Sequence, residues 1–332
     1  MRKNKNPETI QALLSAVNAA DSILLFPHIA PDGDALGSVL ALAMLLKGMD
    51  KQVTAVLDGT VPRQLQFLPC WELFVSPDHA RVDENTLAIA VDVSCSDRMG
   101  ACEALYHAAK SHAVIDHHGT NVGFGEVNWI DATAPATAVL IYRLYRASET
   151  PISKDAALCL YTALSTDTGN FIYESVNAEC FEMMEGLMEA GLELAEYSRL
   201  LFRTKEVTFV RLLSETLPTL RLLANGKIAG LQTSMEKIRR ANADPNHVDG
   251  VVDYAIDLED VCMAYYAHEK ADGSIKFSLR SIAPYRVDQV AAQFGGGGHK
   301  QAAGCGMKLP IDQAVEKMEA AMTAALEAQR NG

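Results

Sequence analysis

Residues 23–38 read Ile23-Leu-Leu-Phe26-Pro-His28-Ile-Ala-Pro31-Asp32-Gly-Asp34-Ala-Leu-Gly37-Ser38. The apolar run 23–26 predicts a buried strand, and residues 38–47 predict a helix. One histidine and two aspartates therefore share a turn at the carboxyl end of a strand, where open α/β sheets place their ligands. The stretch predicts a sheet-and-helix fold with a polar site at one edge of the sheet.

Further acidic and imidazole side chains follow other apolar segments. They are Asp92 at the end of the run 87–92, the triplet Asp116-His117-His118 at the end of 113–116, and Asp167 in the Gly-containing turn Asp167-Thr-Gly169-Asn170. Because parallel strands end at the same edge of a sheet, we expect these side chains to meet the first turn.

Two divalent cations about 3.5–4 Å apart, as in many phosphatases and nucleases, need bridging carboxylates and imidazoles. Asp32 and Asp34 sit at alternate positions of one turn, so they can point to different ions, and Asp92 can bridge both. His117 and Asp167 would complete the second centre. The alternatives are a solvated turn with a helix N-cap for the aspartates, and a hydrogen-bonded pair at a strand end for the histidines. The recurrence of four such motifs favours two metals.

A hydroxide held between two such cations is a nucleophile at neutral pH and would attack phosphorus. Arg98 is a candidate to bind the phosphate, and a surface salt bridge is its alternative. His118 is a candidate to neutralise a phosphate oxygen or to protonate the leaving group. The sequence contains no P-loop and no Gly-x-Ser-x-Gly motif to support a different chemistry.

The chain of 332 residues is long enough for two domains, and 49% of its residues are hydrophobic. Its seven cysteines form no Cys-x-x-Cys pair, which is typical of reduced thiols in a cytoplasmic protein. The sequence shows no signal-peptide pattern and no apolar run of membrane-spanning length, so we expect no membrane association.

The formal net charge of −13 argues against a protein that binds long duplexes by neutralising phosphates. Residues 1–185 contain 12 Lys and Arg against 23 Asp and Glu, whereas the remainder contains 17 against 19. The acidity is therefore concentrated where the candidate metal ligands lie. Bound cations would partly reverse the local field and attract an anionic substrate.

The first half of the chain alternates strands and helices, which predicts a doubly wound, mostly parallel sheet. The expected strands are 23–26, 52–57, 87–92 and 113–116, and the expected helices are 37–49, 101–110, 134–147, 153–165, 180–190 and 194–213. After about residue 215 the pattern changes to hairpins at Asn225-Gly226 and Asp272-Gly273, a helix-like stretch over 247–257, a loop over 295–300 and a final helix over 311–328. This predicts a smaller α+β domain. We expect domains over 1–190 and 215–332, a helical linker over 191–214, and a cleft between the domains.

The glycine run 295–298 offers backbone N–H groups to an anion or a base, because glycine permits close approach. His299 follows it directly, and Arg280 lies on an expected strand. Together they predict a nucleotide-binding surface. A flexible loop with a surface histidine is the alternative.

The motifs at His28–Ser38, Asp92, Asp116-His117-His118 and Asp167 resemble the four motifs of the DHH phosphoesterase superfamily. Phe294-Gly-Gly-Gly-Gly-His299 with Arg280-Ser281 resembles its DHH-associated C-terminal domain, and the whole chain is similar to the NrnA-like group of bifunctional oligoribonucleases and pAp phosphatases. The resemblance implies two Mn²⁺ ions, or Mg²⁺ or another divalent cation. It implies one ion at His28, Asp32 and Asp92, and the other at Asp34, Asp92, His117 and Asp167. Asp116, His118 and Arg98 are the catalytic candidates, and Arg280, Gly296, Gly297, Gly298 and His299 are the substrate-binding candidates.

The expected function is hydrolysis of short oligoribonucleotides to mononucleotides and of pAp to AMP. One alternative is a phosphodiesterase of dinucleotides such as c-di-AMP or pApA. Another is a nucleotide-binding protein without turnover, which the loss of a metal ligand would indicate, and all six ligand candidates are present. The sequence leaves a monomer and a homodimer both open.

Overall fold

The computed structural model describes residues 6–245, 248 and 250–330. The chain forms two compact units, the first ending at Thr204 and the second beginning at Lys205. This division falls inside the segment 191–214.

The expected single helix over 194–213 is wrong: α7 (Leu194–Ser198) runs into a π-helical turn (Arg199–Arg203), and α8 (Val207–Thr216) is separate. Leu201 packs on the core of the first unit and Leu212 on a core of the second, so one helix would have to serve two cores.

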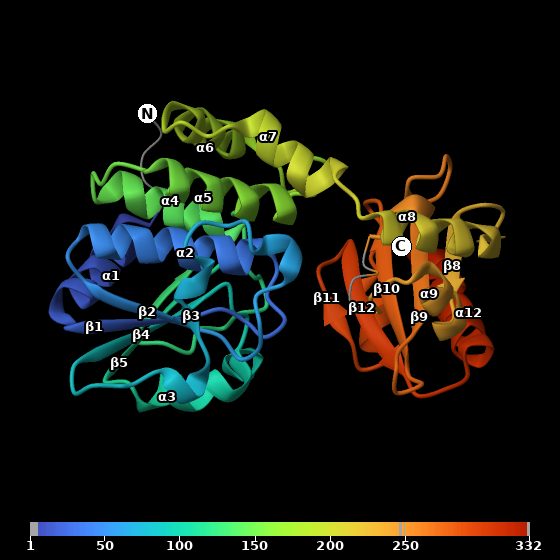
Figure 1. The fold of residues 1–332 in the computed structure, drawn as a ribbon, viewed down its shortest axis with the longest axis horizontal. Coiled ribbons are helices and arrows are strands. Elements are labelled where there is room, and N and C mark those ends of the chain that lie inside the picture. The colour runs from blue at the N-terminus through green and yellow to red at the C-terminus, as the bar shows by residue number, and fades with distance from the viewer. Residues whose placement is uncertain (1–5, 246–247, 249, 331–332) are drawn as a thin grey trace. The chain divides into compact units, whose positions relative to one another are not determined.

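Six parallel strands form the sheet of the first unit, in the order β3-β2-β1-β4-β5-β6 (Figure 1). They are β1 (Ser22–Phe26), β2 (Gln52–Val56), β3 (Phe74–Val75), β4 (Thr86–Val91), β5 (Ser111–Asp116) and β6 (Val127–Ile130). The order is that of a doubly wound sheet, so the predicted α/β class is confirmed. The sequence reading missed β3 and β6, because these strands have only two and four residues.

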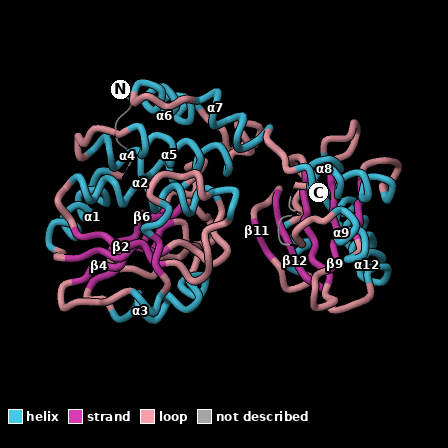
Figure 2. The backbone as a smooth tube through the Cα atoms, in the orientation of Figure 1, coloured by secondary structure: helices cyan, strands magenta, loops and turns pink. Residues whose placement is uncertain are grey.

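Helices cover both faces of this sheet (Figure 2). One face carries α1 (Pro7–Ala19), α2 (Gly33–Gly48) and α4 (Thr137–Ala147), and the other carries α3 (Glu103–Ala108). α5 (Lys154–Asp167) packs on α2 and α4, and α6 (Ala178–Glu189) packs on α5, farther from the sheet (Figure 1). Strand residues alternate between the two cores: Leu25 belongs to the first and Phe26 to the second. Short 3-10 turns lie at Arg63–Leu65, Trp71–Leu73, Pro77–His79 and Ser96–Cys102.

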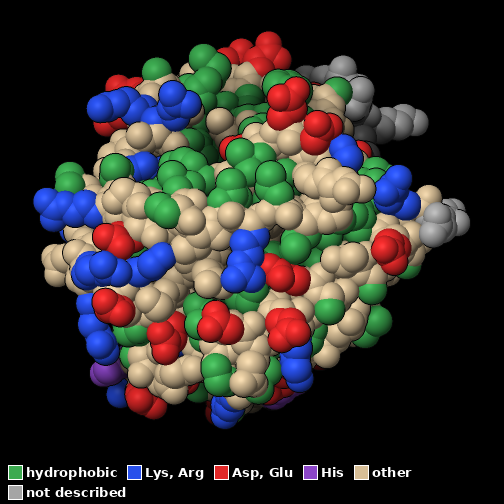
Figure 3. Space-filling view, turned by 90° about the vertical axis from the view of Figure 1, so that its right-hand side faces the viewer, with side chains coloured by type: hydrophobic (Ala, Val, Ile, Leu, Met, Phe, Trp, Pro, Cys, Tyr) green, Lys and Arg blue, Asp and Glu red, His purple; other side chains and the backbone are tan. Residues whose placement is uncertain are grey.

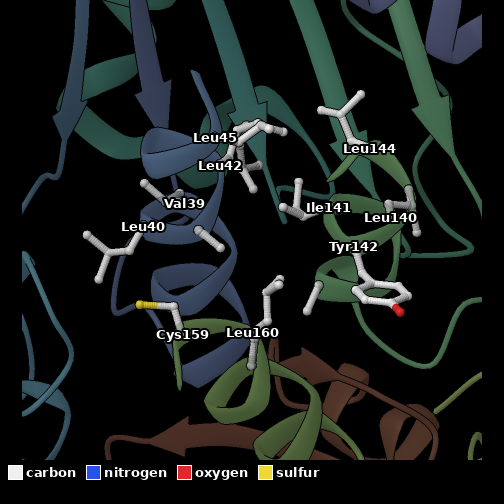
Figure 4. Close-up of a cluster of buried hydrophobic side chains, with 14 of the residues drawn as sticks. Val39, Leu40, Leu42, Leu45, Leu140, Ile141, Tyr142, Leu144, Cys159 and Leu160 are labelled. Carbon is white, nitrogen blue, oxygen red and sulfur yellow. The ribbon is translucent and has the colours of Figure 1, made fainter. Parts of the chain in front are cut away.

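Two glycines of α2 allow α5 to approach closely. A Cβ at Gly33 would collide with the side chain of Thr166, and a Cβ at Gly37 would collide with the carbonyl oxygen of Cys159. Figure 4 shows the apolar side chains that α2, α4 and α5 bring together, among them Val39, Ile141 and Leu160. Because Gly33 begins α2 and Thr166 lies at the end of α5, this packing sets the position of the last residue of α5 beside the first turn of α2.

The second unit has a six-stranded sheet in the order β11-β12-β10-β9-β8-β7. Its strands are β7 (Arg221–Leu223), β8 (Ile228–Thr233), β9 (Met263–Glu269), β10 (Ile275–Ser281), β11 (Gly297–Gly298) and β12 (Ala302–Met307). Only β8 and β9 pair in parallel among these described strands, which agrees with the expected antiparallel-rich α+β fold. One face carries α11 (Asp288–Ala292) and α12 (Ile311–Arg330), and the other carries α8, α9 (Met235–Ala241) and α10 (Asp253–Ile256).

Two expectations for this unit need correction. The segment 295–300 is not simply a loop, because Gly297 and Gly298 form β11, paired with Gly304 and Ala303 of β12. The helix-like stretch over 247–257 is reduced to the single turn of α10, and its residues 247 and 249 lie outside the described part of the chain. Both hairpin turns are present, with Gly226 at φ 82° and Gly273 at φ 78°.

We predict that Gly37→Ala lowers the free energy of unfolding by about 1–3 kcal/mol, because the added methyl group forces α5 away from α2. Urea denaturation of the purified variant measures this change. Gly48→Ala is the matched control on the same helix, since its Cβ would meet only Thr150 Cγ2 at 3.8 Å. Equal stability of the Gly37 and Gly48 variants would contradict the close-packing account.

Candidate metal centre

β1 and β4 are the two central strands of the first sheet, and the strand order reverses between them. β1 lies between β2 and β4, so its carboxyl end and that of β4 flank the point where doubly wound sheets bind ligands (Figure 1). His28 lies two residues beyond β1, and Asp92 directly follows β4. Asp92 has a φ of 62°, a conformation that costs a non-glycine residue energy and is concentrated at functional sites.

Asp32 caps the helix that follows β1. α2 begins at Gly33, before the expected start at residue 37 or 38, and Oδ1 of Asp32 accepts a hydrogen bond of 3.0 Å from the Ala35 amide. The same Oδ1 lies 3.8 Å from Nε2 of His28. The expected N-cap and the expected metal-ligand position are therefore compatible, because the same carboxylate caps α2 and lies near His28.

Asp34 is buried between the amino-terminal ends of two helices. It lies in the first turn of α2 and accepts hydrogen bonds from the Thr137 amide at 2.6 Å and the Ala138 amide at 3.0 Å, both at the start of α4. The Thr137 hydroxyl donates to Oδ1 of Asp92 at 2.8 Å. The positive end of the α4 dipole thus offsets part of the cost of burying these carboxylates.

The sequence reading missed Thr137 and Ala138. Their amides act through the backbone, which is the same for every residue but proline. A polar Thr at the start of an apolar helix, six residues after Asp131, was the available indication.

The six expected ligand residues form two neighbouring groups, and Asp92 lies close to both of them. His28, Asp32 and Asp92 offer ligand atoms within 4.8 Å of one another, as do Asp34, His117 and Asp167. Nε2 of His117 lies 3.3 Å from Asp167 Oδ2 and 3.7 Å from Asp92 Oδ1, while Nε2 of His28 lies 3.8 Å from Asp92 Oδ2. The two oxygens of Asp92 therefore face different groups.

Backbone carbonyls fix the tautomers of His28 and His117. Nδ1 of His28 contacts the Ile29 carbonyl oxygen at 2.8 Å, and Nδ1 of His117 contacts the Ala134 carbonyl oxygen at 3.2 Å. A carbonyl can only accept, so each Nδ1 carries a hydrogen and each Nε2 faces the carboxylates, where its lone pair is available to a cation once the ring is neutral. This is the arrangement that metal-binding histidines adopt.

Asp116 and His118 form a hydrogen-bonded pair next to the two groups, and His118 also offers a ligand atom within 4.8 Å of those of Asp92 and His117. Asp116 is fully buried, and its Oδ1 accepts from the His117 amide at 2.8 Å and from His118 Nδ1 at 2.7 Å. Its Oδ2 accepts from Asn121 Nδ2 at 2.7 Å. Asp116 therefore orients His118, and Asn121, which the sequence reading missed, holds Asp116 in place.

Arg98 reaches the site through its main chain. Its carbonyl oxygen accepts a hydrogen bond of 2.7 Å from the Ile29 amide, next to His28, while its side chain is exposed. The backbone at Arg98 thus supports the His28 loop, and the guanidinium faces solvent.

The crowded carboxylates favour added positive charge. Burial and the charge of Asp92 raise the pKa of Asp34 to about 7, and burial and the charge of Asp32 raise the pKa of Asp92 to about 6. Burial also raises the pKa of Asp167 to about 7. Burial alone would lower the pKa of His117, but Asp167, Asp92 and Asp34 together raise it to about 9. Without a cation, the site takes up protons in its place.

The expected nucleotide-binding residues lie in the second unit. Nε of Arg280 on β10 is 3.5 Å from Asp253 Oδ1, and its Nη1 donates to the Leu279 carbonyl. A Cβ at Gly296 would collide with the Gly304 carbonyl, and Gly298 has a φ of 140°, so both positions require glycine. His299 follows β11 in a tight turn, where its amide donates to the Ala302 carbonyl at 2.8 Å.

We predict that the metal-free protein loses stability as pH rises from about 5 to about 9. Folded-state pKa values of about 7, 6 and 7 for Asp34, Asp92 and Asp167 exceed the ordinary value of 3.8, so stability falls as these groups deprotonate. The raised pKa values of His28 and His117, about 9 each, extend the loss to higher pH.

Urea denaturation of the protein after chelator treatment, repeated across this pH range, measures the effect. Added Mn²⁺ is the matched condition: it competes with protons, so the stabilisation that it produces should grow with pH. A metal-free stability that rises over the same range would contradict the burial of these groups as a cluster.

Residues 22–164 match the N-terminal domain of the DHH family, and residues 227–328 match the DHHA1 domain. It is 30% identical over 298 residues to the bifunctional oligoribonuclease and PAP phosphatase NrnA of Thermus thermophilus, covering 89% of this chain and 87% of that relative. It is 24% identical to the cyclic-di-AMP phosphodiesterase GdpP of Geobacillus thermodenitrificans, covering 87% of this chain and 45% of that relative.

A solved structure of an exopolyphosphatase-related protein from Bacteroides fragilis superposes with a TM-score of 0.91 at 25% identity, covering 99% of this chain and 98% of that chain. The family matches and the Thermus relative together span both units. The chain therefore belongs to the DHH phosphoesterase family, with a DHHA1 domain in its second unit.

Proposed function

We propose that this protein is a metal-dependent phosphodiesterase that hydrolyses short oligoribonucleotides to mononucleotides and dephosphorylates pAp to AMP. The observation that carries the proposal is the position of Asp92, whose two oxygens face two different groups of metal-ligand side chains. The activity is that of the Thermus relative, whose match covers 89% of this chain and 87% of that relative.

Two divalent cations fit the residues present. One would be held by His28, Asp32 and Asp92, and the other by Asp34, Asp92, His117 and Asp167. The carbonyl-anchored imidazoles and the buried carboxylates are the donors that Mn²⁺ accepts, and Mg²⁺ would suit the oxygen-rich second group. When bound, such a pair lowers the pKa of water and stabilises negative charge on a phosphate.

His118 and Arg98 are the side chains that we assign to the substrate. Asp116 holds Nδ1 of His118 by a 2.7 Å hydrogen bond, so Nε2 is the ring nitrogen that would donate a proton to the leaving oxygen. Burial lowers the pKa of His118, but its hydrogen bond to Asp116 and the charges of Asp92 and Asp116 together raise it above the ordinary value. Asp116 acts as a positioning residue. The exposed guanidinium of Arg98 would bind a phosphate oxygen.

The charge distribution favours short substrates. On the face that Figure 3 shows, Lys and Arg side chains are interspersed with Asp and Glu, and that face offers no continuous basic path for a long phosphate backbone. We assign recognition to single nucleotides, through Arg280, Gly296, Gly297, Gly298 and His299. Among the described residues, we find no helix whose length and hydropathy would let it span a bilayer.

A dinucleotide phosphodiesterase is the second candidate function. The GdpP relative carries the name of a cyclic-di-AMP phosphodiesterase, and its match extends over 87% of this chain. That relative is about twice as long, however, because the match covers only 45% of it.

The test of the proposal is a panel of labelled RNA dinucleotides, longer RNAs, pAp, c-di-AMP and pyrophosphate, each with Mn²⁺ or Mg²⁺. We expect fastest turnover of the RNA dinucleotides and of pAp. Preferential cleavage of c-di-AMP would support the second candidate. A metal-loaded protein that binds pApA but leaves it intact would refute an enzymatic function.

In the same assay, Asp92→Ala should lower turnover by at least about 100-fold, because both metal groups lose a donor at once. Asp97→Ala is the matched control, since Asp97 is an exposed carboxylate on the loop that follows Asp92. Near-normal turnover by the Asp92 variant would contradict the bridging role.

We predict that Arg280→Ala raises KM by about 10–100-fold, the value of one charge-assisted hydrogen bond, and leaves Mn²⁺ occupancy unchanged. Steady-state kinetics on RNA dinucleotides and metal analysis of the purified variant measure the two quantities. Lys270→Ala, at an exposed position of the same unit, should change neither. Loss of metal from the Arg280 variant would contradict the division of roles between the two units.

A further inference from the structure

Arg143 is a buried charge that the catalytic assignment does not use. It lies in the middle of α4 and is only 4% exposed. Its Nη1 donates to Asp131 Oδ2 at 2.6 Å, and its Nε and Nη2 donate to the two oxygens of Glu179 at 2.6 and 2.8 Å. The guanidinium thus joins the end of β6, α4 and the first turn of α6. A bidentate contact of this kind fixes orientation as well as distance.

The Asp131 side of this cluster leads to the candidate metal centre. The Asp131 amide donates to the Asp116 carbonyl at 3.1 Å, and the Asp131 carbonyl accepts from the Ala134 amide at 2.9 Å. Its Oδ1 accepts from the Thr133 amide and hydroxyl at 3.0 and 2.6 Å. The segment 131–134 is therefore a closed turn that both Arg143 and the end of β5 hold in place.

The other end of this turn contacts the imidazole of His117. The Ala134 carbonyl accepts the hydrogen on His117 Nδ1 at 3.2 Å, which sets the orientation of the ring and leaves Nε2 to face Asp34, Asp92 and Asp167. Two residues further on, Ala136 is the N-cap of α4, whose first amides bind Asp34. Displacement of the turn would move the imidazole and the amides together.

We propose that Arg143 is a positioning residue for the second metal group, acting through Asp131 and the turn 131–134 on the ring of His117. The proposal rests on the proposed metal-dependent function. A buried ion pair is weak evidence for a stabilising role, because apolar side chains of similar size stabilise a core equally well. A series of hydrogen bonds of 2.6 to 3.2 Å instead connects Arg143, through Asp131 and the turn, to the ligand candidate His117.

The experiment measures Mn²⁺ affinity by electron paramagnetic resonance of the free ion, together with folding by circular dichroism. Arg143→Met alone removes the cation from two partly buried carboxylates, so the triple variant Asp131→Asn, Arg143→Met, Glu179→Gln removes all three charges and keeps the volumes similar. We expect this folded variant to bind the weaker of two Mn²⁺ ions about 10–100-fold less tightly than the wild type. The single variant Arg143→Lys, which keeps both carboxylates, should bind this ion more tightly than the triple variant does, since an ammonium can replace one of the guanidinium contacts.

Tyr145→Phe is the matched control on the same helix, because it removes a buried hydrogen bond of 2.8 Å to the Ala41 carbonyl without touching the turn 131–134. Its Mn²⁺ affinity should equal that of the wild type. The proposal is overturned if the folded triple variant binds two Mn²⁺ ions with wild-type affinity, or if Tyr145→Phe loses affinity equally. Failure of the wild type itself to bind two ions would refute the metal centre instead, so the two failures are distinguishable.

Discussion

Asp34 is a buried carboxylate held between the first turn of α2 and the first amides of α4. The hydrogen bonds from Thr137 and Ala138 allow a charge to remain in the core, and the Thr137 hydroxyl extends the same support to Asp92. Neither carboxylate would be tolerated there without such partners. Asp34 comes after β1 and Asp92 comes after β4. Because α4 binds both carboxylates, it brings the ends of these two strands into one site.

The packing of helices supplies the remaining members of the site. Gly33 and Gly37 let α5 lie against α2, so that Asp167 at the end of α5 reaches His117 at 3.3 Å. The turn between β6 and α4 orients His117, and a carbonyl in the loop after β1 orients His28. Backbone groups hold four of the ligand candidates, which are His28, Asp32, Asp34 and His117, and the Thr137 hydroxyl holds Asp92. This gives a precise geometry without long side-chain networks.

The parts of the site that carry their own side-chain chemistry could be predicted from the sequence. His28, Asp32, Asp34, Asp92, His117 and Asp167 follow apolar strands or end a helix, and parallel strands bring such positions to one edge. Thr137, Ala138 and Ala134 could not be found in the same way, because they act through amides and carbonyls that every residue has. Arg143 was recognisable only as a charge within an apolar helical run, which requires a buried partner that sequence spacing does not identify.

The limits of the fold prediction have similar causes. β11 consists of two glycines, which carry no side-chain pattern, and its pairing depends on the turn after His299. The break between α7 and α8 follows from the division of their apolar residues between two cores, and helical periodicity alone continues through it. Strand order and class, by contrast, follow from the alternation of strands and helices in the first unit.

The central claim is that Asp92 is shared by two cations at the ends of β1 and β4. Anomalous diffraction from crystals of the full chain grown with Mn²⁺ tests it most directly. The account predicts two peaks about 3.5–4 Å apart, one beside His28 and Asp32 and the other beside Asp34, His117 and Asp167, with Asp92 between them. A single peak, or two peaks of which only one contacts Asp92, would contradict it.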